Sequence, residues 1–144
     1  MSIAAKAEKI VNDFKKFEAW EKKYEHLIAL GKSLNTLPES EHKDELKVKG
    51  CQSQVWIKSE LKDGRVYFQG DSDALLVKGL VALVLSIYSG ETPQDIIKFE
   101  PLFLKEIGLD SGLSPSRSNG LFSMIKQVKY YAVAYEIMLS QPKK

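Results

Sequence analysis

The feature that most constrains the fold is an apolar segment in the middle of the chain. Residues 74–88 read ALLVKGLVALVLSIY, with Lys78 as the one charged side chain. The segment is shorter than the roughly 20 apolar residues that cross a bilayer. It is apolar nearly all round, which predicts a helix at the centre of a globular core that ends at Gly90. Lys78 is expected to extend to the surface or to find a carboxylate partner.

A β-hairpin is predicted immediately before this helix. In residues 54–62, Val55, Ile57 and Leu61 alternate with more polar side chains, the period-two pattern of a strand. Asp63-Gly64 follows, and Asp-Gly favours the two-residue turn in which both central positions have positive φ. Residues 65–69 supply the return strand, so the predicted hairpin spans residues 54–69.

Helices are predicted on both sides of the hairpin. Apolar residues at helical spacing mark residues 3–17 and 20–28, with Gly31 as a stop, and the polar residues 38–47 suggest a surface connection. Thr92-Pro93 and Ser114-Pro115 resemble helix starts, the second opening a helix to about residue 139, and a short helix is expected at 102–107. This order predicts an α+β fold, a small antiparallel sheet packed against several helices, in one domain over residues 1–144.

Composition narrows the class of function. The 144 residues carry 21 Lys and Arg against 19 Asp and Glu, a net charge of +2. That balance argues against binding nucleic acid or an anionic membrane through bulk charge. The first 14 residues mix charged and apolar side chains and have no secretory apolar region. A soluble, cytoplasmic protein is therefore expected.

The chain has one cysteine, Cys51, and two histidines, His26 and His42. One cysteine excludes an intramolecular disulfide. The usual ligands of a structural zinc site or an iron–sulfur cluster are too few, so no metal centre is expected.

Cys51 lies between Gly50 and Gln52 at a junction of loop and strand. A buried structural cysteine and a functional one are both compatible with this pattern. His26 and His42 are expected on the surface, which disfavours a Cys–His protease, and a thiol oxidoreductase would need a second cysteine. The remaining chemistry is a thiol that accepts a group by itself, for example by exchange with a sulfur on another protein.

Arg117 is expected in the first turn of the final helix. The positive end of the helix dipole and a guanidinium together suit an anion such as a carboxylate or thiolate, although a solvated arginine explains the pattern equally well. Asp71 and Asp73 precede the apolar helix and are interpreted as capping carboxylates rather than an acid–base pair.

Three stretches resemble the SufE family of sulfur-acceptor proteins, which includes CsdE. They are VKGCQSQVWI at 48–57, GDSDALLVKGL at 70–80 and LSPSRSNGL at 113–121. The pattern from Trp20 to Gly31 also fits, so the resemblance runs from about residue 20 to residue 131.

The resemblance implies a sulfur-transfer accessory protein rather than a free-standing enzyme. Its partner would be a cysteine desulfurase of SufS or CsdA type, which holds the pyridoxal phosphate, so this chain would need no cofactor. Cys51 would carry a persulfide and pass sulfur to a downstream acceptor or cluster scaffold for iron–sulfur cluster assembly. Asp73 would restrain the Cys51 loop, and Arg117, with Gly50 and Gln52, would support the loop or the interface. The family fold resembles that of IscU-type scaffolds, and a monomer or weak homodimer is expected.

Two alternatives follow from the same residues: an interaction module that activates a desulfurase with Cys51 inert, and a redox-sensing thiol. The carrier role requires a loop that shelters the sulfur when the protein is unbound and exposes it to a partner, so the loop must have two conformations. Gly50 is predicted to be part of the hinge.

Overall fold

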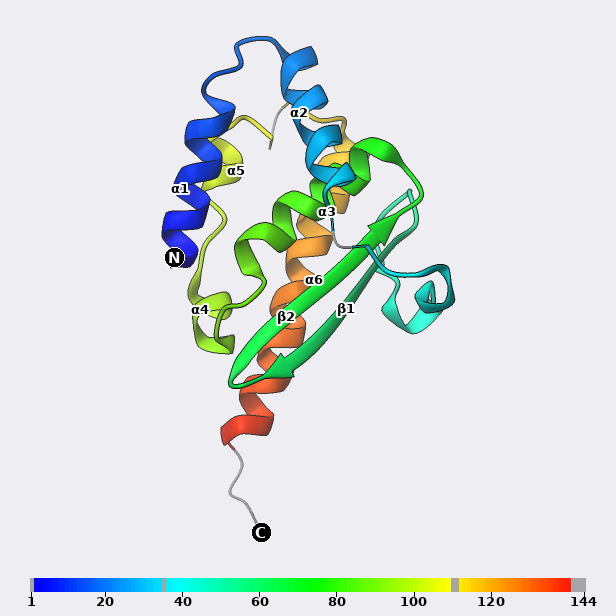
Figure 1. The fold of residues 1–144 in the computed structure, drawn as a ribbon, viewed down its shortest axis with the longest axis vertical. Coiled ribbons are helices and arrows are strands. Elements are labelled where there is room, and N and C mark those ends of the chain that lie inside the picture. Colours follow the sequence, from blue (N-terminus) through cyan, green and yellow to red (C-terminus); the bar gives the residue numbers. More distant parts are fainter. Residues whose placement is uncertain (1, 35, 110–111, 141–144) are drawn as a thin grey trace.

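A computed structural model describes residues 2–34, 36–109 and 112–140. Figure 1 shows a β-hairpin lying across a set of helices, with the long C-terminal helix running behind it. The elements in chain order are α1 (Ile3–Phe14), α2 (Trp20–Lys32), the short 3₁₀ turns η1 (Glu39–Glu41) and η2 (Asp44–Leu46), β1 (Val55–Lys62), β2 (Arg65–Ser72), α3 (Leu75–Tyr88), α4 (Pro93–Lys98), α5 (Phe103–Glu106) and α6 (Pro115–Ser140).

Helix α3 is the centre of the core, as the apolar segment predicts. Leu80, Leu83 and Ile87 are fully buried, and the helix contacts α1, α2, α6 and both strands. In Figure 1 it passes between α2 and the hairpin on one side and α6 on the other. An all-round apolar helix is stable in water only when other elements cover it on every side, so α3 determines where the rest must pack.

The hairpin is confirmed, and its turn has the predicted geometry. β1 and β2 pair antiparallel from Lys62 opposite Arg65 to Val55 opposite Ser72. Asp63 and Gly64 have φ of 53° and 78°, the positive values of a tight two-residue turn. Strand β2 extends three residues past the predicted end at residue 69, because Gly70, Asp71 and Ser72 complete the pairing with β1. The described residues thus form an α+β fold with a two-stranded sheet.

The predicted helix starts are also confirmed. The Thr92 hydroxyl accepts a hydrogen bond from the Asp95 amide at 3.2 Å, and the Ser114 hydroxyl accepts one from the Arg117 amide at 3.4 Å. Arg117, one of the residues expected at the site, thus lies in the first turn of α6.

The predicted stop at Gly31 is wrong. α2 continues to Lys32, and Gly31 is buried where α2 crosses α3. A Cβ on Gly31 would lie 2.8 Å from the Gly79 amide nitrogen, and a Cβ on Gly79 would collide with the Leu27 carbonyl. The two glycines therefore let the backbones of α2 and α3 approach closely. Close packing of helices and the end of a helix both favour glycine, so the sequence does not distinguish them.

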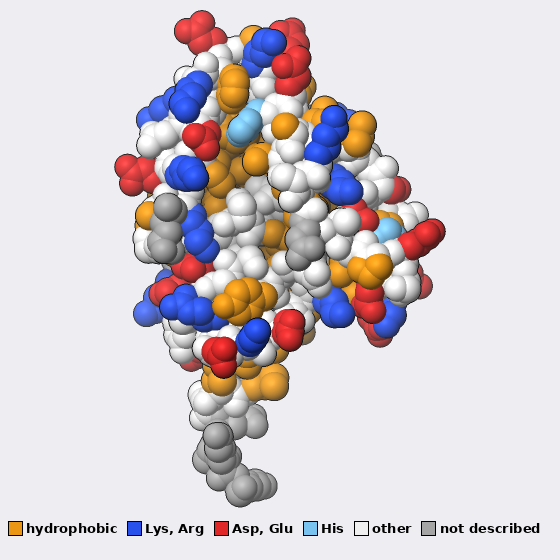
Figure 2. Space-filling view, in the orientation of Figure 1, with side chains coloured by type: hydrophobic (Ala, Val, Ile, Leu, Met, Phe, Trp, Pro, Cys, Tyr) orange, Lys and Arg blue, Asp and Glu red, His pale blue; other side chains and the backbone are white. Residues whose placement is uncertain are grey.

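Surface charge is mixed. On the face shown in Figure 2, cationic and anionic side chains are interspersed, and apolar surface gathers in the hollow between α1 and α3 and near the C-terminal end of α6. No helix among the described residues is both long enough and apolar enough to cross a membrane.

Candidate functional site

Cys51 lies on a short loop that is closed at its base by backbone pairing. The Val48 amide donates to the Val55 carbonyl at 2.8 Å, and Lys47 forms an isolated β-bridge with Trp56. Residues 49–54, called the Cys loop below, project from this base.

The C-terminal end of the Cys loop is tied to the junction between β2 and α3. The Gln54 amide donates to Oδ1 of Asp73 at 3.0 Å, and the Gln54 carbonyl accepts from the Ser72 hydroxyl at 2.8 Å and the Asp73 amide at 3.3 Å. Three hydrogen bonds therefore fix a residue only three positions after Cys51.

These contacts overturn the interpretation of Asp71 and Asp73 as helix caps. Ala74 is the N-cap of α3 and makes no side-chain capping bond; its amide donates to the Ser72 hydroxyl at 3.3 Å. The Asp73 carboxylate is instead committed to the Cys loop at Gln54, a partner that is remote in sequence. Local capping rules do not anticipate such a partner.

The N-terminal end of the Cys loop turns at Gly50. Its φ of +89° lies in the left-handed region, and a Cβ there would lie 2.7 Å from the Ser123 hydroxyl oxygen on α6. A side chain would meet both backbone strain and a close contact. Glycine at position 50 therefore favours the conformation in which the loop lies against α6.

Cys51 itself rests on α6. Its Sγ lies 3.5 Å from the Gly120 carbonyl oxygen, to which the thiol donates, and the side chain is half-buried. A Cβ on Gly120 would lie 3.4 Å from the same sulfur, in van der Waals contact with it. Gly120 was not identified from the sequence, although a glycine inside a helix is unfavourable by propensity and signals a packing reason.

A cavity of about 300 Å³ opens beside the sulfur. The Cys loop, α3 and the start of α6 each contribute walls to it, and the lining comprises Cys51, Gln52, Ser53, Val77, Leu80, Ser114, Ser116, Arg117, Gly120 and Met124. Its volume is about ten times the roughly 30 Å³ that a water molecule occupies in the liquid. There is room next to the thiol for a further sulfur atom.

The sulfur environment keeps the thiol protonated. Burial raises the pKa of Cys51, because the thiolate would lose hydration. Arg117 lines the same cavity but its side chain is exposed. A persistent resting thiolate is therefore not what this conformation provides.

A second set of contacts anchors the polar connection, and the sequence did not predict it. The His42 ring stacks on Trp56 at 4.0 Å between ring centroids, and Nε2 lies 2.9 Å from Oδ2 of Asp71. The Asp71 carboxylate also lies 3.4 Å from Nζ of Lys78, the carboxylate partner expected for that lysine. Burial alone would raise the pKa of Asp71, but the Ser72 amide, Thr36, His42 and Lys78 together hold it below its usual value.

Both histidines were expected to be solvated, and both are partly buried instead. His26 packs against Phe14 and Phe17, with ring centroids 5.0 and 5.2 Å away. Neither histidine lines the cavity beside Cys51. Within the described residues, no group of three or more His, Cys, Asp or Glu side chains is placed to hold a metal ion.

Comparison with known proteins identifies the family of the chain. Residues 8–132 match the family model described as "SufE: Fe-S metabolism associated domain". The chain belongs to the SufE family. Two SufE-like relatives, both described as uncharacterized, are 43% and 42% identical. The one from Synechocystis sp. aligns over 90% of this chain and 81% of its own length, and the one from Rhizobium meliloti over 85% and 91%.

The fold of this SufE-family chain also occurs in a solved structure. The solution structure of a hypothetical protein from Thermus thermophilus superposes with a TM-score of 0.75 at 21% identity, covering 92% of this chain and 96% of that one. The SufE assignment associates this chain with iron–sulfur metabolism.

Of the site residues expected from sequence, the fold brings three to one cavity: Cys51, Gln52 and Arg117. Gly50 lies outside that cavity, against α6, and Asp73 holds the other end of the Cys loop. The apolar wall from α3 and the contact with Gly120 complete the site.

Proposed function

We propose that this protein accepts sulfane sulfur from a pyridoxal-phosphate-dependent cysteine desulfurase on Cys51 and passes it on for iron–sulfur cluster assembly. The observation that carries the proposal is that the single thiol of the chain lies on a tethered loop beside a cavity large enough for another sulfur. Membership of a family associated with iron–sulfur metabolism supports it. The pyridoxal phosphate belongs to the partner.

The transfer is an exchange at sulfur. The Cys51 thiol gives up its proton, and the thiolate attacks the terminal sulfur of a persulfide on the desulfurase. A new S–S bond forms on Cys51 as the S–S bond of the desulfurase persulfide breaks, and the desulfurase cysteine leaves as a thiolate that takes up a proton. No external oxidant or reductant is needed. A downstream acceptor or cluster scaffold then receives the sulfur.

The raised pKa of Cys51 divides this chemistry between two conformations. At rest, burial and the hydrogen bond to Gly120 keep the thiol protonated and poorly nucleophilic. Attack requires the Cys loop to leave α6, which hydrates the sulfur and brings its pKa toward the ordinary value of about 8.5. Gly50 is the proposed hinge, because its backbone already occupies a region open to glycine. Partner contacts supply the bias toward the open state.

The cavity has a matching role after transfer. When the loop returns to α6, the added sulfur occupies the space between α3 and the start of α6. Val77, Leu80 and Met124 give that space an apolar wall, which limits attack by small thiols in solution.

The test is mass spectrometry of the Cys51 peptide after incubation with a desulfurase and cysteine. The proposal expects a gain of one sulfur, about 32 Da, that is removed by a reducing thiol. Cys51→Ser should acquire nothing. If the wild-type peptide gains no mass and desulfurase turnover is unchanged, the carrier function is wrong.

Cys51→Ser also separates the carrier from the interaction module, and treatment with peroxide tests the redox-sensing thiol. An interaction module would stimulate the desulfurase equally well with serine at position 51, whereas a carrier would lose the stimulation. A redox-sensing thiol would form a stable sulfenic acid or mixed disulfide with peroxide and would need no desulfurase.

A further inference from the structure

A second hollow lies on the α6 side of the Cys loop, outside the sulfur cavity. It is a groove of about 910 Å³ between the polar connection (residues 38–47) and the middle of α6, and it is called the lysine groove here. Its lining comprises Asp44, Glu45, Lys47, Lys49, Gly50, Ser123, Lys126, Gln127 and Tyr130.

The Cys loop separates the groove from the sulfur cavity. Lys49 and Gly50 line the groove, whereas Cys51, Gln52 and Ser53 line the cavity. α6 is shared in the same way, since Gly120 and Met124 face the cavity and Ser123 and Gln127 face the groove. A ligand in the groove would therefore touch the backbone beside Cys51 while leaving the cavity open.

The groove is lined by three lysines and two carboxylates, so its charge is net positive. Lys47, Lys49 and Lys126 are exposed and form no ion pair with any residue that the structure describes. The three lysines line the groove together with Gly50: Lys47 and Lys49 precede Gly50 in the chain, and Lys126 lies about one helical turn beyond Ser123, against which Gly50 packs. Asp44 and Glu45 line the groove from η2, farther along the chain from Cys51.

Aromatic side chains border these cations. Tyr130 is 71% exposed and Phe122 is 47% exposed. With Lys126 between them, they follow a four-residue spacing and so lie on one side of α6. Exposed aromatic residues at the centre of a contact surface commonly carry much of the binding energy.

We propose that the lysine groove docks an acidic segment of the sulfur-donating desulfurase, with an apolar side chain of that segment resting on Tyr130. This inference rests on the proposed function and adds where the donor binds. Carboxylates would pair with the lysines that line the groove with Gly50. The partner would then contact the loop segment whose movement releases Cys51, and could favour the open conformation. Docking and opening of the loop are then coupled through one contact surface.

The experiment measures the dissociation constant of the desulfurase for this chain by isothermal titration calorimetry at low and at high salt. All variants carry Cys51→Ser, so that no sulfur transfer contributes. Lys49→Glu with Lys126→Glu should weaken binding about tenfold or more, and the loss should shrink as salt rises. Tyr130→Ala should weaken binding at both salt concentrations.

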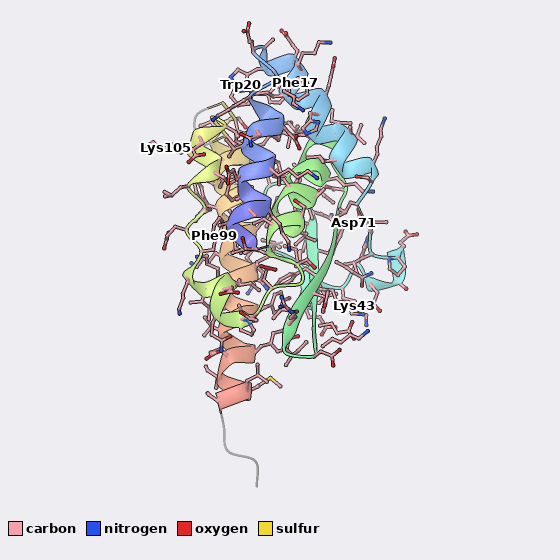
Figure 3. All side chains as sticks on the ribbon, turned by 60° about the vertical axis from the view of Figure 1, so that its left-hand side comes forward. Phe17, Trp20, Lys43, Asp71, Phe99 and Lys105 are labelled. Carbon is pink, nitrogen blue, oxygen red and sulfur yellow. The ribbon has the colours of Figure 1, made fainter. Side chains whose placement is uncertain are left out.

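Two controls give the groove its specificity. Lys105→Glu changes an exposed lysine on α5, which Figure 3 shows on the opposite side of the molecule from Lys43 in the polar connection, and should leave binding within twofold. Asp44→Lys with Glu45→Lys reverses the acidic part of the groove and should tighten binding, because it removes the two carboxylates that repel an acidic segment. Circular dichroism checks that each variant is folded.

The proposal is overturned if the lysine reversals bind within twofold of their parent, if the acidic reversal weakens binding as much as the lysine reversal, or if the parent does not bind the desulfurase. Sulfur transfer to wild-type Cys51 is measured separately. Transfer with unchanged binding of the lysine variants contradicts the docking site alone, whereas groove-dependent binding without transfer contradicts the carrier function alone.

Discussion

The Gln54 amide donates to Oδ1 of Asp73 at 3.0 Å, which joins the end of the Cys loop to the start of α3. The bond ties the segment that carries Cys51 to the most deeply buried helix. The same two residues are linked again by the Asp73 amide and the Gln54 carbonyl at 3.3 Å. This end of the loop is therefore held by a few polar contacts.

Removing the Asp73 carboxylate should loosen the loop. Asp73→Ala deletes the acceptor for the Gln54 amide, a loss of about 1 kcal/mol for one hydrogen bond. The expected result is a several-fold faster alkylation of Cys51 by iodoacetamide at neutral pH. Asp73→Asn keeps an acceptor oxygen at the same place and should react nearly as the wild type does. Equal rates for wild type and Asp73→Ala would show that the bond does not restrain the loop.

Gly50→Ala tests the proposed hinge. An alanine at φ of +89° costs about 1–2 kcal/mol and would also press on Ser123, so the closed loop is disfavoured. Faster alkylation of Cys51 and altered transfer of sulfur from the desulfurase are expected. Gly64→Ala is the matched control, because Gly64 also has positive φ but nothing lies near its missing Cβ. The hinge idea fails if Gly50→Ala changes neither sulfur transfer nor partner affinity.

The raised pKa of Cys51 has a measurable consequence for stability. The unfolded thiol ionises near pH 8.5, whereas the folded thiol stays protonated to higher pH. A group whose pKa is raised on folding contributes stability that is present below the unfolded pKa and is lost as pH rises toward the folded pKa. The free energy of unfolding should therefore fall above about pH 8.5 more steeply for the wild type than for Cys51→Ser. Parallel curves from urea titrations would contradict burial of the thiol.

Much of this architecture follows from local pattern. The alternation in residues 54–62, the Asp63-Gly64 turn and the Thr92 and Ser114 caps each depend on neighbours in sequence, and each was predicted correctly. Local pattern failed for Gly31, interpreted as a helix stop, and for Asp73, interpreted as a helix cap, because their partners Gly79 and Gln54 are distant along the chain. A glycine that ends a helix and one that packs against another helix look alike in local sequence, and so do an aspartate that caps a helix and one that binds a distant loop.

The site shows the same division. Cys51 stands out because it is the one thiol, and the family motif points to Gln52 and Arg117, which line its cavity. Gly120 and the apolar wall from α3 become part of the site only through packing of α3 against α6. Partial burial of His42 likewise requires Trp56 and Asp71, which come from two paired strands.

The close crossing of α2 and α3 stabilises the helix at the centre of the core. Gly79→Ala would drive a methyl group into the Leu27 carbonyl, and overpacking of this kind costs about 1–3 kcal/mol. A lower urea midpoint with an unchanged slope is expected. An unchanged midpoint for Gly79→Ala would mean that the helices separate without cost.

The central claim is that sulfur moves from a desulfurase to Cys51, and a single-turnover transfer of radioactive sulfur tests it most directly. A desulfurase preloaded with a ³⁵S persulfide, freed of cysteine, is mixed with an equal amount of this protein. Label that leaves the desulfurase and appears on the Cys51 peptide of the wild type, but not on Cys51→Ser, is the predicted result. The account would be contradicted if the label stayed on the desulfurase, or if the wild type and Cys51→Ser acquired label equally.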